Sequence, residues 1–425
     1  MKPILNFFKA IYEREKYLTF LIFFLSIICS LLFLIFFKNI GPSEHQIPGS
    51  DYFAYYEPLA NSILSGRGFV IFGKVPLNVG PIYPIFLSGI LMISRFFWFD
   101  KFFLITIFNV ILAAASSCFL FLLAREIFNK KIALLSSILW MSYPFNLWFI
   151  KNPNTEVPFI PLLYFGIFLY ILAAKKKDLK IMFFSGLILG LSSLARLINL
   201  FLPLALFLFI FFLLEGELKK KKLIFATVFL LGAVISFLPW GLYTFAKTGN
   251  FIPFSHIASK GIIQGFVTLS REGKGVGGKA DVVLEEVKAV DALGNETGTF
   301  YFLIRTFFKN PFVFIKLIGL KMARSWYATY MMWWESAILA VQMVYISSSL
   351  FGLIYCLKKC KDKIKHITLI LIIIFYFWAI DILTGSILRY MVPAMGILII
   401  FSAITISLLL DKIRKKFQWK QNLSQ

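Results

Sequence analysis

The stretch SDYFAYYEPLANSILSGRGF, residues 50–69, follows the first long hydrophobic run of the chain. It gathers an aspartate, a glutamate and three tyrosines beside a segment long enough to cross a membrane, in a chain with only 21 acidic residues. Carboxylates are costly next to a hydrocarbon layer, so their concentration at this point needs a reason. The place of this stretch among the hydrophobic runs and basic clusters around it decides how the chain folds across the membrane.

The same stretch carries the signals of a short helix. Ser50 or Asp51 can cap its N-terminus, and the pattern runs to Ser65 before Gly66 stops it. Asp51 and Tyr55 fall one turn apart on one face. The apolar stripe at helical spacing, which we expect to face the membrane, consists of Tyr52, Tyr56, Leu59 and Ile63. On this pattern alone, Asp51 is either a helix cap or a functional carboxylate.

Composition places the whole chain in the membrane class. Of its 425 residues 59% are hydrophobic and 51 are phenylalanine, whereas soluble domains are roughly 45–50% apolar. Apolar runs of about 18–23 residues recur along the sequence, each enough to cross a hydrocarbon core of roughly 30 Å. The first run, 17–37, is longer than the core of a signal peptide and no cleavage site follows it, so we expect an uncleaved span. The sequence predicts an all-α polytopic membrane protein.

The net charge of +23 comes from short basic clusters between the apolar runs. This distribution is typical of membrane topology rather than of a nucleic-acid surface, so we expect no nucleic-acid partner. The ten predicted spans are 17–37, 103–124, 132–149, 157–174, 180–196, 199–214, 223–240, 336–357, 367–383 and 390–410. With the N-terminus inside, the clusters on the cytoplasmic side hold more than half of the 44 lysines and arginines; they are 2–16, 125–131, 175–180, 219–222, 358–365 and 412–420.

This orientation decides one ambiguous segment. Residues 81–98 are apolar enough to span, but counting them would place every later basic cluster outside. We therefore expect an external helix that packs on the membrane or dips into it. The predicted parts are a cytoplasmic N-terminus 1–16, a first span 17–37, an external loop 38–102, a bundle 103–242, an external region with interfacial helices 243–335, C-terminal spans 336–410 and a cytoplasmic tail 411–425. No cysteine falls in a predicted external loop, so we expect no disulfide framework.

Several short motifs, in chain order, resemble those of the GT-C glycosyltransferases. The first loop contains D-x-x-x-Y, A-N-x-x-L-x-G-x-G-F and G-P-I-Y-P, and the second predicted external loop contains N-P-N-T-E at 152–156. The later motifs are G-L-x-L-G-L-x-x-L-A-R at 186–196, L-P-W at 238–240, T-G-N-F-I-P-F-S at 248–255 and L-R-Y-M-V-P at 388–393. The chain is thus similar to the dolichyl-phosphate-mannose-protein mannosyltransferases and the lipid A aminoarabinose transferases, polytopic enzymes that take a sugar from a polyprenyl-phosphate carrier.

The resemblance implies a GT-C-like bundle of about ten transmembrane helices, with juxtamembrane helices and two large external loop regions. It implies that Asp51 is the general base that deprotonates an acceptor hydroxyl. Glu156 corresponds to the acid of the second loop in the family, which would hold the acceptor or a metal beside Asp51. Tyr55, Tyr56 and Glu57 are then expected to contact the acceptor.

The leaving phosphate of such a donor needs cationic partners. The candidates are Arg389 with Tyr390 beside it, at the predicted external end of the last span, and then Arg196 and Lys74. Arg389 and Arg196 can also be interfacial arginines that extend to the membrane surface. The aminoarabinose transferases have a lysine before a Pro-Pro-Leu element, but residues 78–81 read Asn-Val-Gly-Pro here, so that contact is not carried over to Lys74.

Two further features are weighed as binding sites. Residues 273–279 fit G-x-x-x-x-G-K, but Ala280 follows where nucleotide-binding loops carry Ser or Thr, so we expect a flexible loop beside the site instead. His45 or His256 could join the two acids around a divalent cation, Mg²⁺ or Mn²⁺, although no spacing resembles a zinc site. Metal dependence stays open, and no other cofactor is expected.

A second interfacial region is predicted around residues 305–334. Arg305, Lys309 and Lys316 fall on one helical face, and Asn310-Pro311 is expected to interrupt the helix. A basic face of this kind can guide an anionic carrier lipid or rest on headgroups.

The leading hypothesis is an inverting glycosyltransferase of the cell membrane that works on the external side. Its partners would be a polyprenyl-phosphate-linked sugar (undecaprenyl or dolichyl), membrane lipid, and an acceptor that is a protein, a lipid or a glycan. One alternative is a membrane polysaccharide polymerase or ligase, which would use external arginines and histidine. Another is a lipid or solute transporter, which would need polar residues near mid-span. The predicted spans are nearly uncharged, which favours the enzyme.

Overall fold

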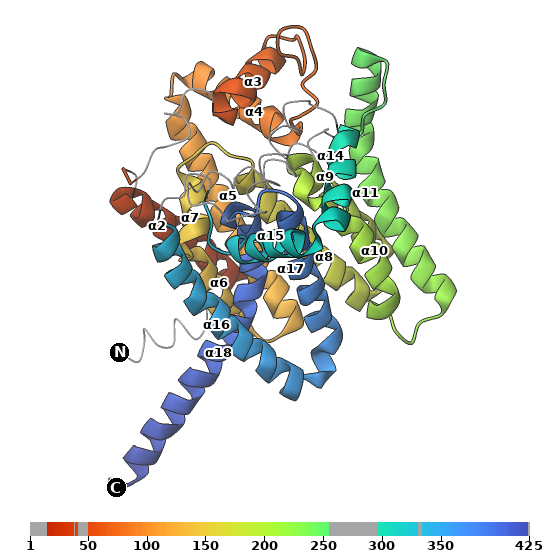
Figure 1. The fold of residues 1–425 in the computed structure, drawn as a ribbon. Coiled ribbons are helices and arrows are strands. Elements are labelled where there is room, and N and C mark those ends of the chain that lie inside the picture. Colours follow the sequence, from red (N-terminus) through yellow and green to blue (C-terminus); the bar gives the residue numbers. More distant parts are fainter. Residues whose placement is uncertain (1–14, 38, 41–49, 255–295, 330–333, 424–425) are drawn as a thin grey trace. The chain divides into compact units, whose positions relative to one another are not determined.

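The computed structural model describes residues 15–37, 39–40, 50–254, 296–329 and 334–423. Within these ranges all regular structure is helical, apart from an isolated bridge between Ile71 and Lys74 (Figure 1). A helix satisfies its backbone hydrogen bonds within its own segment, which a chain in hydrocarbon requires because no water is there to pair with them. The predicted all-α fold class is confirmed.

The chain divides into two compact units, which are described separately. The first consists of the described parts of Met1–Ser255, Ser349–Ile367 and Ile399–Gln425. The second consists of the described parts of His256–Ser348 and Thr368–Leu398.

The helices follow one another with short connections. They are α2 (Glu15–Phe37), η2 (Tyr52–Tyr56), α3 (Glu57–Leu64), α4 (Ile82–Phe97), α5 (Lys101–Ile127), α6 (Lys130–Met141), α7 (Pro144–Ile150), α8 (Glu156–Lys176), α9 (Leu179–Ala195), η3 (Leu197–Asn199), α10 (Leu202–Leu213), α11 (Lys219–Thr248), α14 (Glu296–Lys309), α15 (Pro311–Arg324), α16 (Glu335–Lys359), η4 (Lys361–Lys363), α17 (Ile364–Leu383) and α18 (Leu388–Leu423). The break between α14 and α15 falls at Asn310, as predicted from the following proline.

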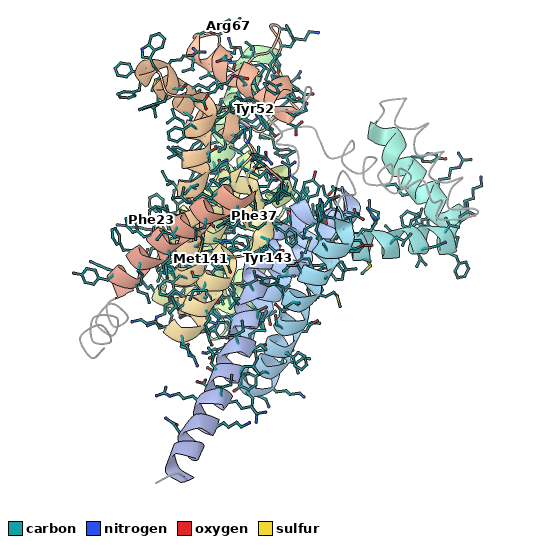
Figure 2. The ribbon with its side chains drawn as sticks, turned by 90° about the vertical axis from the view of Figure 1, so that its left-hand side faces the viewer. Phe23, Phe37, Tyr52, Arg67, Met141 and Tyr143 are labelled. Atoms are coloured by element: carbon teal, nitrogen blue, oxygen red, sulfur yellow. The ribbon has the colours of Figure 1, made fainter. Side chains whose placement is uncertain are left out.

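Seven of these helices are long and apolar enough to cross a membrane. An eighth span results if α6 and α7 are counted together; they meet at a bend of 55°, close to Met141 and Tyr143 (Figure 2). The predicted spans 180–196 and 199–214 correspond to α9 and α10, which are helical but shorter than a typical span, so the count of about ten is not confirmed. α4, with 16 residues, also falls below that length, and the external placement of residues 81–98 stays a prediction.

Close backbone contact holds α9 against α11 in the first unit. A Cβ added to Gly186 would overlap the carbonyl oxygen of Phe229, and one added to Gly232 would overlap that of Phe183. Small residues at a helix interface let two backbones approach, which is the usual packing device of membrane helices. The glycines of the G-L-x-L-G-L motif therefore have a structural use in this bundle.

The basic clusters predicted on the cytoplasmic side are joined by ion pairs within the first unit. Lys175 pairs with Glu126 at 3.0 Å, and Lys131 pairs with Asp411 at 2.6 Å. Two acids between α10 and α11 collect further lysines: Glu215 pairs with Lys365 at 2.8 Å, whereas Glu217 pairs with Lys177 and Lys221. Hydrogen bonds from these lysines lower the pKa of both glutamates. Clusters far apart in the sequence thus meet at one end of the unit.

The loop between α2 and α5 forms a small layer of its own, in which α3 lies beside α4 (Figure 1). The stripe of Tyr52, Tyr56 and Leu59 is buried in this layer, and the Tyr56 and Tyr83 rings pack edge to face with centroids 4.8 Å apart. The prediction that this stripe faces the membrane is therefore wrong. The apolar face of α4 covers it, and the sequence pattern of one helix cannot show which partner covers its apolar side.

Candidate functional site

Asp51 stands at the start of the helical stretch, immediately before η2. It is exposed, and within the described part of the chain its side chain has no hydrogen-bond or ion-pair partner. Asp51 occupies the N-cap position of η2, but its side chain accepts no capping hydrogen bond. The first backbone bond of this stretch runs from Ala54 N to Ser50 O, at 2.9 Å. The C-terminal prediction is confirmed: α3 ends at Leu64, and Gly66 follows with a φ of +75°.

The two other described carboxylates of this loop are engaged. Glu57, whose side chain is 16% exposed, pairs with Lys101. Asp100 caps α5 by accepting from Phe103 N at 2.8 Å. Asp51 is therefore the carboxylate of the described first loop that remains available to a ligand.

The three residues predicted to contact the acceptor lie in different surroundings. Tyr56 is 8% exposed and belongs to the packed core of the loop. Tyr55 is half-buried against the same core, and Glu57 is held by Lys101. Burial and the neighbouring Glu57 also raise the pKa of Tyr52, whose side chain is fully buried. Of these side chains Tyr55 is the one that is partly exposed and is not held in an ion pair.

Glu156 begins α8 and is fully buried. Its carboxylate forms an ion pair with Arg196, whose side chain is 12% exposed. Nη1 of the same arginine donates to Thr155 Oγ1 at 3.1 Å. The structure thus pairs Glu156, which was expected to hold the acceptor or a metal, with Arg196, which was expected to bind the donor phosphate. The stability of a charge buried in this way depends on its partner, because the pairing offsets the loss of hydration.

The N-P-N-T-E loop fixes Glu156 through its asparagines. Asn154 Oδ1 accepts from the backbone nitrogens of Glu156 and Val157, at 3.1 and 3.3 Å, and so caps α8. Its Nδ2 donates to the carbonyls of Phe149 and Asn152. The sequence pattern marked this loop as a motif, and the structure gives its asparagine the role of holding the start of α8.

Arg196 is positioned by the end of α9. The helix stops at Ala195, Arg196 is extended with a φ of −147°, and the short helix η3 follows. Buried Asn199 fastens this break by donating to Leu189 O at 3.2 Å and to Ser192 Oγ at 2.7 Å. The arginine is therefore carried by a rigid turn and not by a flexible helix end.

The first loop is anchored next to this turn. Gly80 packs so closely on the carbonyl of Leu194 that any Cβ would overlap the oxygen. Phe69 N donates to Tyr243 Oη at 2.7 Å, which ties the loop to the end of α11. Lys74 lies exposed between these anchors, on the isolated bridge with Ile71.

Arg389 and Tyr390 belong to the second unit and open α18. Both are half-buried, and Tyr390 N donates to Ile387 O at 3.1 Å. The second unit also holds three buried charged residues that the sequence analysis missed, Lys321, Arg324 and Asp381; part-buried Glu335 pairs with Arg324 at 3.3 Å. A usable signal was present for Asp381, since it is a carboxylate inside the predicted span 367–383.

The described residues do not supply a metal centre. They contain no group of three or more histidines, cysteines, aspartates or glutamates placed to hold an ion, and the Glu156 carboxylate is already paired with Arg196. We therefore derive no step through a metal. His45, His256 and the glycine-rich stretch 273–279 lie outside the described residues.

A family model matches residues 78–243, and it is that of the dolichyl-phosphate-mannose-protein mannosyltransferases. The matched range contains Glu156 and Arg196 but neither Asp51 nor Arg389. No curated protein sequence matches the chain.

The solved structures that resemble the chain include an archaeal oligosaccharyltransferase. The Archaeoglobus fulgidus enzyme tethered to an acceptor peptide containing an NVT sequon matches with a TM-score of 0.60 at 14% identity, over 94% of this chain and 50% of the other. The oligosaccharyltransferase AglB of that organism, in complex with an inhibitory peptide and a dolichol-phosphate, matches with a TM-score of 0.59 at 15% identity, over 96% and 52%. The chain thus spans about half the length of these enzymes and shares the fold of that half. The resemblance to the GT-C fold is confirmed.

Proposed function

We propose that the protein is an inverting membrane glycosyltransferase that moves a sugar from a polyprenyl-phosphate carrier to an acceptor hydroxyl at the external face. The matches to a mannosyltransferase family and to an oligosaccharyltransferase fold support this class of activity. The related AglB structure is a complex with a dolichol-phosphate, which supports a lipid-linked donor for this chain as well.

The observation that carries the proposal is the state of Asp51. The other described carboxylates of the first two predicted external loops are engaged: Glu57 with Lys101, Asp100 with the backbone, and Glu156 with Arg196. Asp51 is exposed and unpaired in the described structure, at the N-terminal end of a helix. A general base needs such a carboxylate, accessible and charged.

The reaction then takes one displacement. Asp51 accepts the proton of the acceptor hydroxyl, the acceptor oxygen forms a bond to the anomeric carbon, and the bond from that carbon to the phosphate oxygen breaks. The electron pair leaves with the polyprenyl phosphate. The configuration at the anomeric carbon is inverted, because the acceptor oxygen attacks on the face opposite to the departing phosphate. No covalent sugar–enzyme intermediate is needed.

The candidate basic residues have different proposed roles in this reaction. In our proposal Arg389, with Tyr390 beside it, is the first candidate for stabilising the leaving phosphate, and exposed Lys74 of the first loop is a separate candidate. Arg196 acts mainly on Glu156, since Nη1 of its guanidinium already contacts that carboxylate and Thr155. Glu156 in turn would orient the acceptor beside the base.

Purified protein in lipid vesicles, supplied with radiolabelled polyprenyl-phosphate hexoses and pentoses, tests the function directly. The expected result is release of polyprenyl phosphate in step with transfer of label to an added acceptor extract. Vesicles that move the labelled lipid or sugar across the bilayer without cleaving the sugar–phosphate bond would contradict the proposal and favour a transporter. Absence of cleavage with all donors would also contradict it.

A further inference from the structure

The segment 384–387 joins α17 to α18 in the second unit and ends next to Arg389. Its backbone is strained: Ser386 has a φ of +52°, in the left-handed region that residues other than glycine rarely adopt. Gly385 leaves room for the Tyr390 ring, which occupies the space a Cβ would take. A turn of this kind persists only if the surrounding structure holds it.

Helix α15 contacts this turn from one side. The side chain of Lys321 is fully buried, and its Nζ donates to the carbonyl of Thr384 at 3.0 Å. Just beyond the helix, the carbonyl of Ala328 accepts from Leu388 N at 2.9 Å. Two contacts from the 321–328 stretch thus bracket the turn from its first residue to the start of α18.

Asp381, near the end of α17, supplies the other side. It is fully buried; its Oδ1 accepts from Ile387 N at 3.2 Å and its backbone oxygen accepts from Ser386 N at 2.9 Å. Its Oδ2 has no hydrogen-bond partner among the described residues. Lys321 and Asp381 therefore contact the same turn, one from α15 and the other from α17.

The two helices that carry the pair are docked on each other. Trp378 Nε1 donates to Met322 O at 3.1 Å, and the rings of Trp326 and Trp378 pack edge to face with centroids 5.6 Å apart. Burial lowers the pKa of Lys321 to about 7, against the opposing effect of Asp381. Burying a lysine side chain costs free energy. The hydrogen bond to Thr384 O gives this buried lysine a structural role, which is to anchor the turn.

We propose that Lys321 and Asp381 are positioning residues: together they hold the strained 384–387 turn so that Arg389 and Tyr390 are presented to the phosphate of the lipid-linked donor. Neither side chain can touch the donor itself, because both are fully buried. The inference rests on the proposed function for the identity of the ligand, but the clamp itself is a property of the described contacts.

Binding of undecaprenyl phosphate to the full-length protein in nanodiscs tests the inference, with variants made singly and together. We expect Lys321→Met to raise the Kd about tenfold in the wild-type background and less than about twofold in the Arg389→Ala background, because a residue that acts through Arg389 has nothing left to position. Lys412→Met is the matched control, an exposed lysine near the C-terminal end of α18 that should leave the Kd unchanged. An equal rise in both backgrounds, or no rise in either, would overturn the proposal.

The aspartate is tested by its chemistry. Asp381→Asn keeps an oxygen to accept from Ile387 N and should stay near wild type, whereas Asp381→Leu should behave as Lys321→Met does. Hydrogen exchange of the 384–390 peptide, which needs no ligand, should accelerate in Lys321→Met and Asp381→Leu and not in Lys412→Met. If Lys321→Met fails to fold, Lys321→Met combined with Asp381→Asn removes both buried charges and carries the same prediction. Unchanged exchange in that variant would refute the clamp.

These readouts separate the two proposals. If the wild type binds undecaprenyl phosphate through Arg389 but transfers no sugar, the proposed function fails and the clamp stands. If Arg389→Ala binds as the wild type does, Arg389 is not the phosphate ligand and the inference fails in its present form.

Discussion

At the scale of single residues, two carboxylates of the predicted external loops differ in burial and pairing. Asp51 is exposed and unpaired within the described structure, so it can accept a proton from a bound hydroxyl. Glu156 is fully buried and paired with Arg196, so it can orient a neighbour but depends on its partner for its charge. The proposed roles of base and support rest on this difference in burial and pairing.

The Glu156–Arg196 pair can be tested by neutralising one partner. Glu156→Gln leaves a guanidinium beside a neutral amide in a dry site, and breaking a buried pair in this way typically costs about 3–5 kcal/mol of unfolding free energy. We expect that loss, measured by denaturant unfolding in detergent, together with loss of sugar transfer. Glu57→Gln is the matched control: its pair with Lys101 is partly exposed, so about 1 kcal/mol or less should be lost. Equal losses in the two variants would contradict the buried-pair interpretation.

Sequence patterns identified the carboxylates and arginines of the site but not their surroundings. Residue type and order along the chain were enough to single out Asp51, Glu156 and Arg196. The salt bridge between the last two was missed because it joins the start of α8 to the end of α9, 40 positions apart, and only packing brings them together. Lys321 was missed for the same reason, since nothing in its neighbourhood in the sequence marks it as buried.

At the scale of helices, membrane packing explains what the local patterns left out. The apolar stripe of α3 faces α4 rather than lipid, and α9 and α11 touch through their glycines. Helix existence was read well from hydrophobic runs, because each segment must satisfy its own backbone. The neighbour that each side of a helix contacts could not be predicted, because apolar residues cover lipid-facing and protein-facing surfaces alike.

The glycine contact between α9 and α11 gives a prediction for the elements. Gly186→Ala forces the Cβ against the carbonyl of Phe229, a backbone atom that cannot turn aside, so the melting temperature should fall and expression with it. Gly89→Ala in α4 has nothing within 4 Å of the added Cβ. It should be neutral or stabilising by up to about 1 kcal/mol through helix propensity. Thermal unfolding of both variants in the same detergent checks this, and a neutral Gly186→Ala would mean that the two helices are not in close contact.

At the scale of the whole molecule, the predicted orientation rests on charge. The clusters assigned to the cytoplasmic side meet through ion pairs in the first unit, although they come from segments as distant as Lys131 and Asp411. The number of spans was harder to predict, because α9 and α10 are apolar yet short, and α6 and α7 meet at a bend. Hydropathy along the chain detects an apolar segment but not its length as a straight helix.

Single cysteines placed in a background without the four native cysteines test the orientation. Arg67→Cys, in the exposed first loop, should react with a membrane-impermeant maleimide added to intact cells, whereas Lys220→Cys should react only after permeabilisation. Both positions are exposed, so a difference in labelling reports side and not burial. The opposite pattern would invert the topology and place Asp51 inside the cell.

The central claim, that Asp51 is the base of a sugar transfer, is tested most directly by comparing two aspartates of the same loop in one assay. Asp51→Asn and Asp100→Asn are each assayed for transfer from a radiolabelled polyprenyl-phosphate sugar, with equal amounts of folded protein in lipid. Because asparagine still caps a helix, Asp100→Asn should keep near wild-type activity. Asp51→Asn should lose at least about a hundredfold, the usual contribution of a general base. Transfer by Asp51→Asn at a rate close to that of Asp100→Asn would contradict the claim.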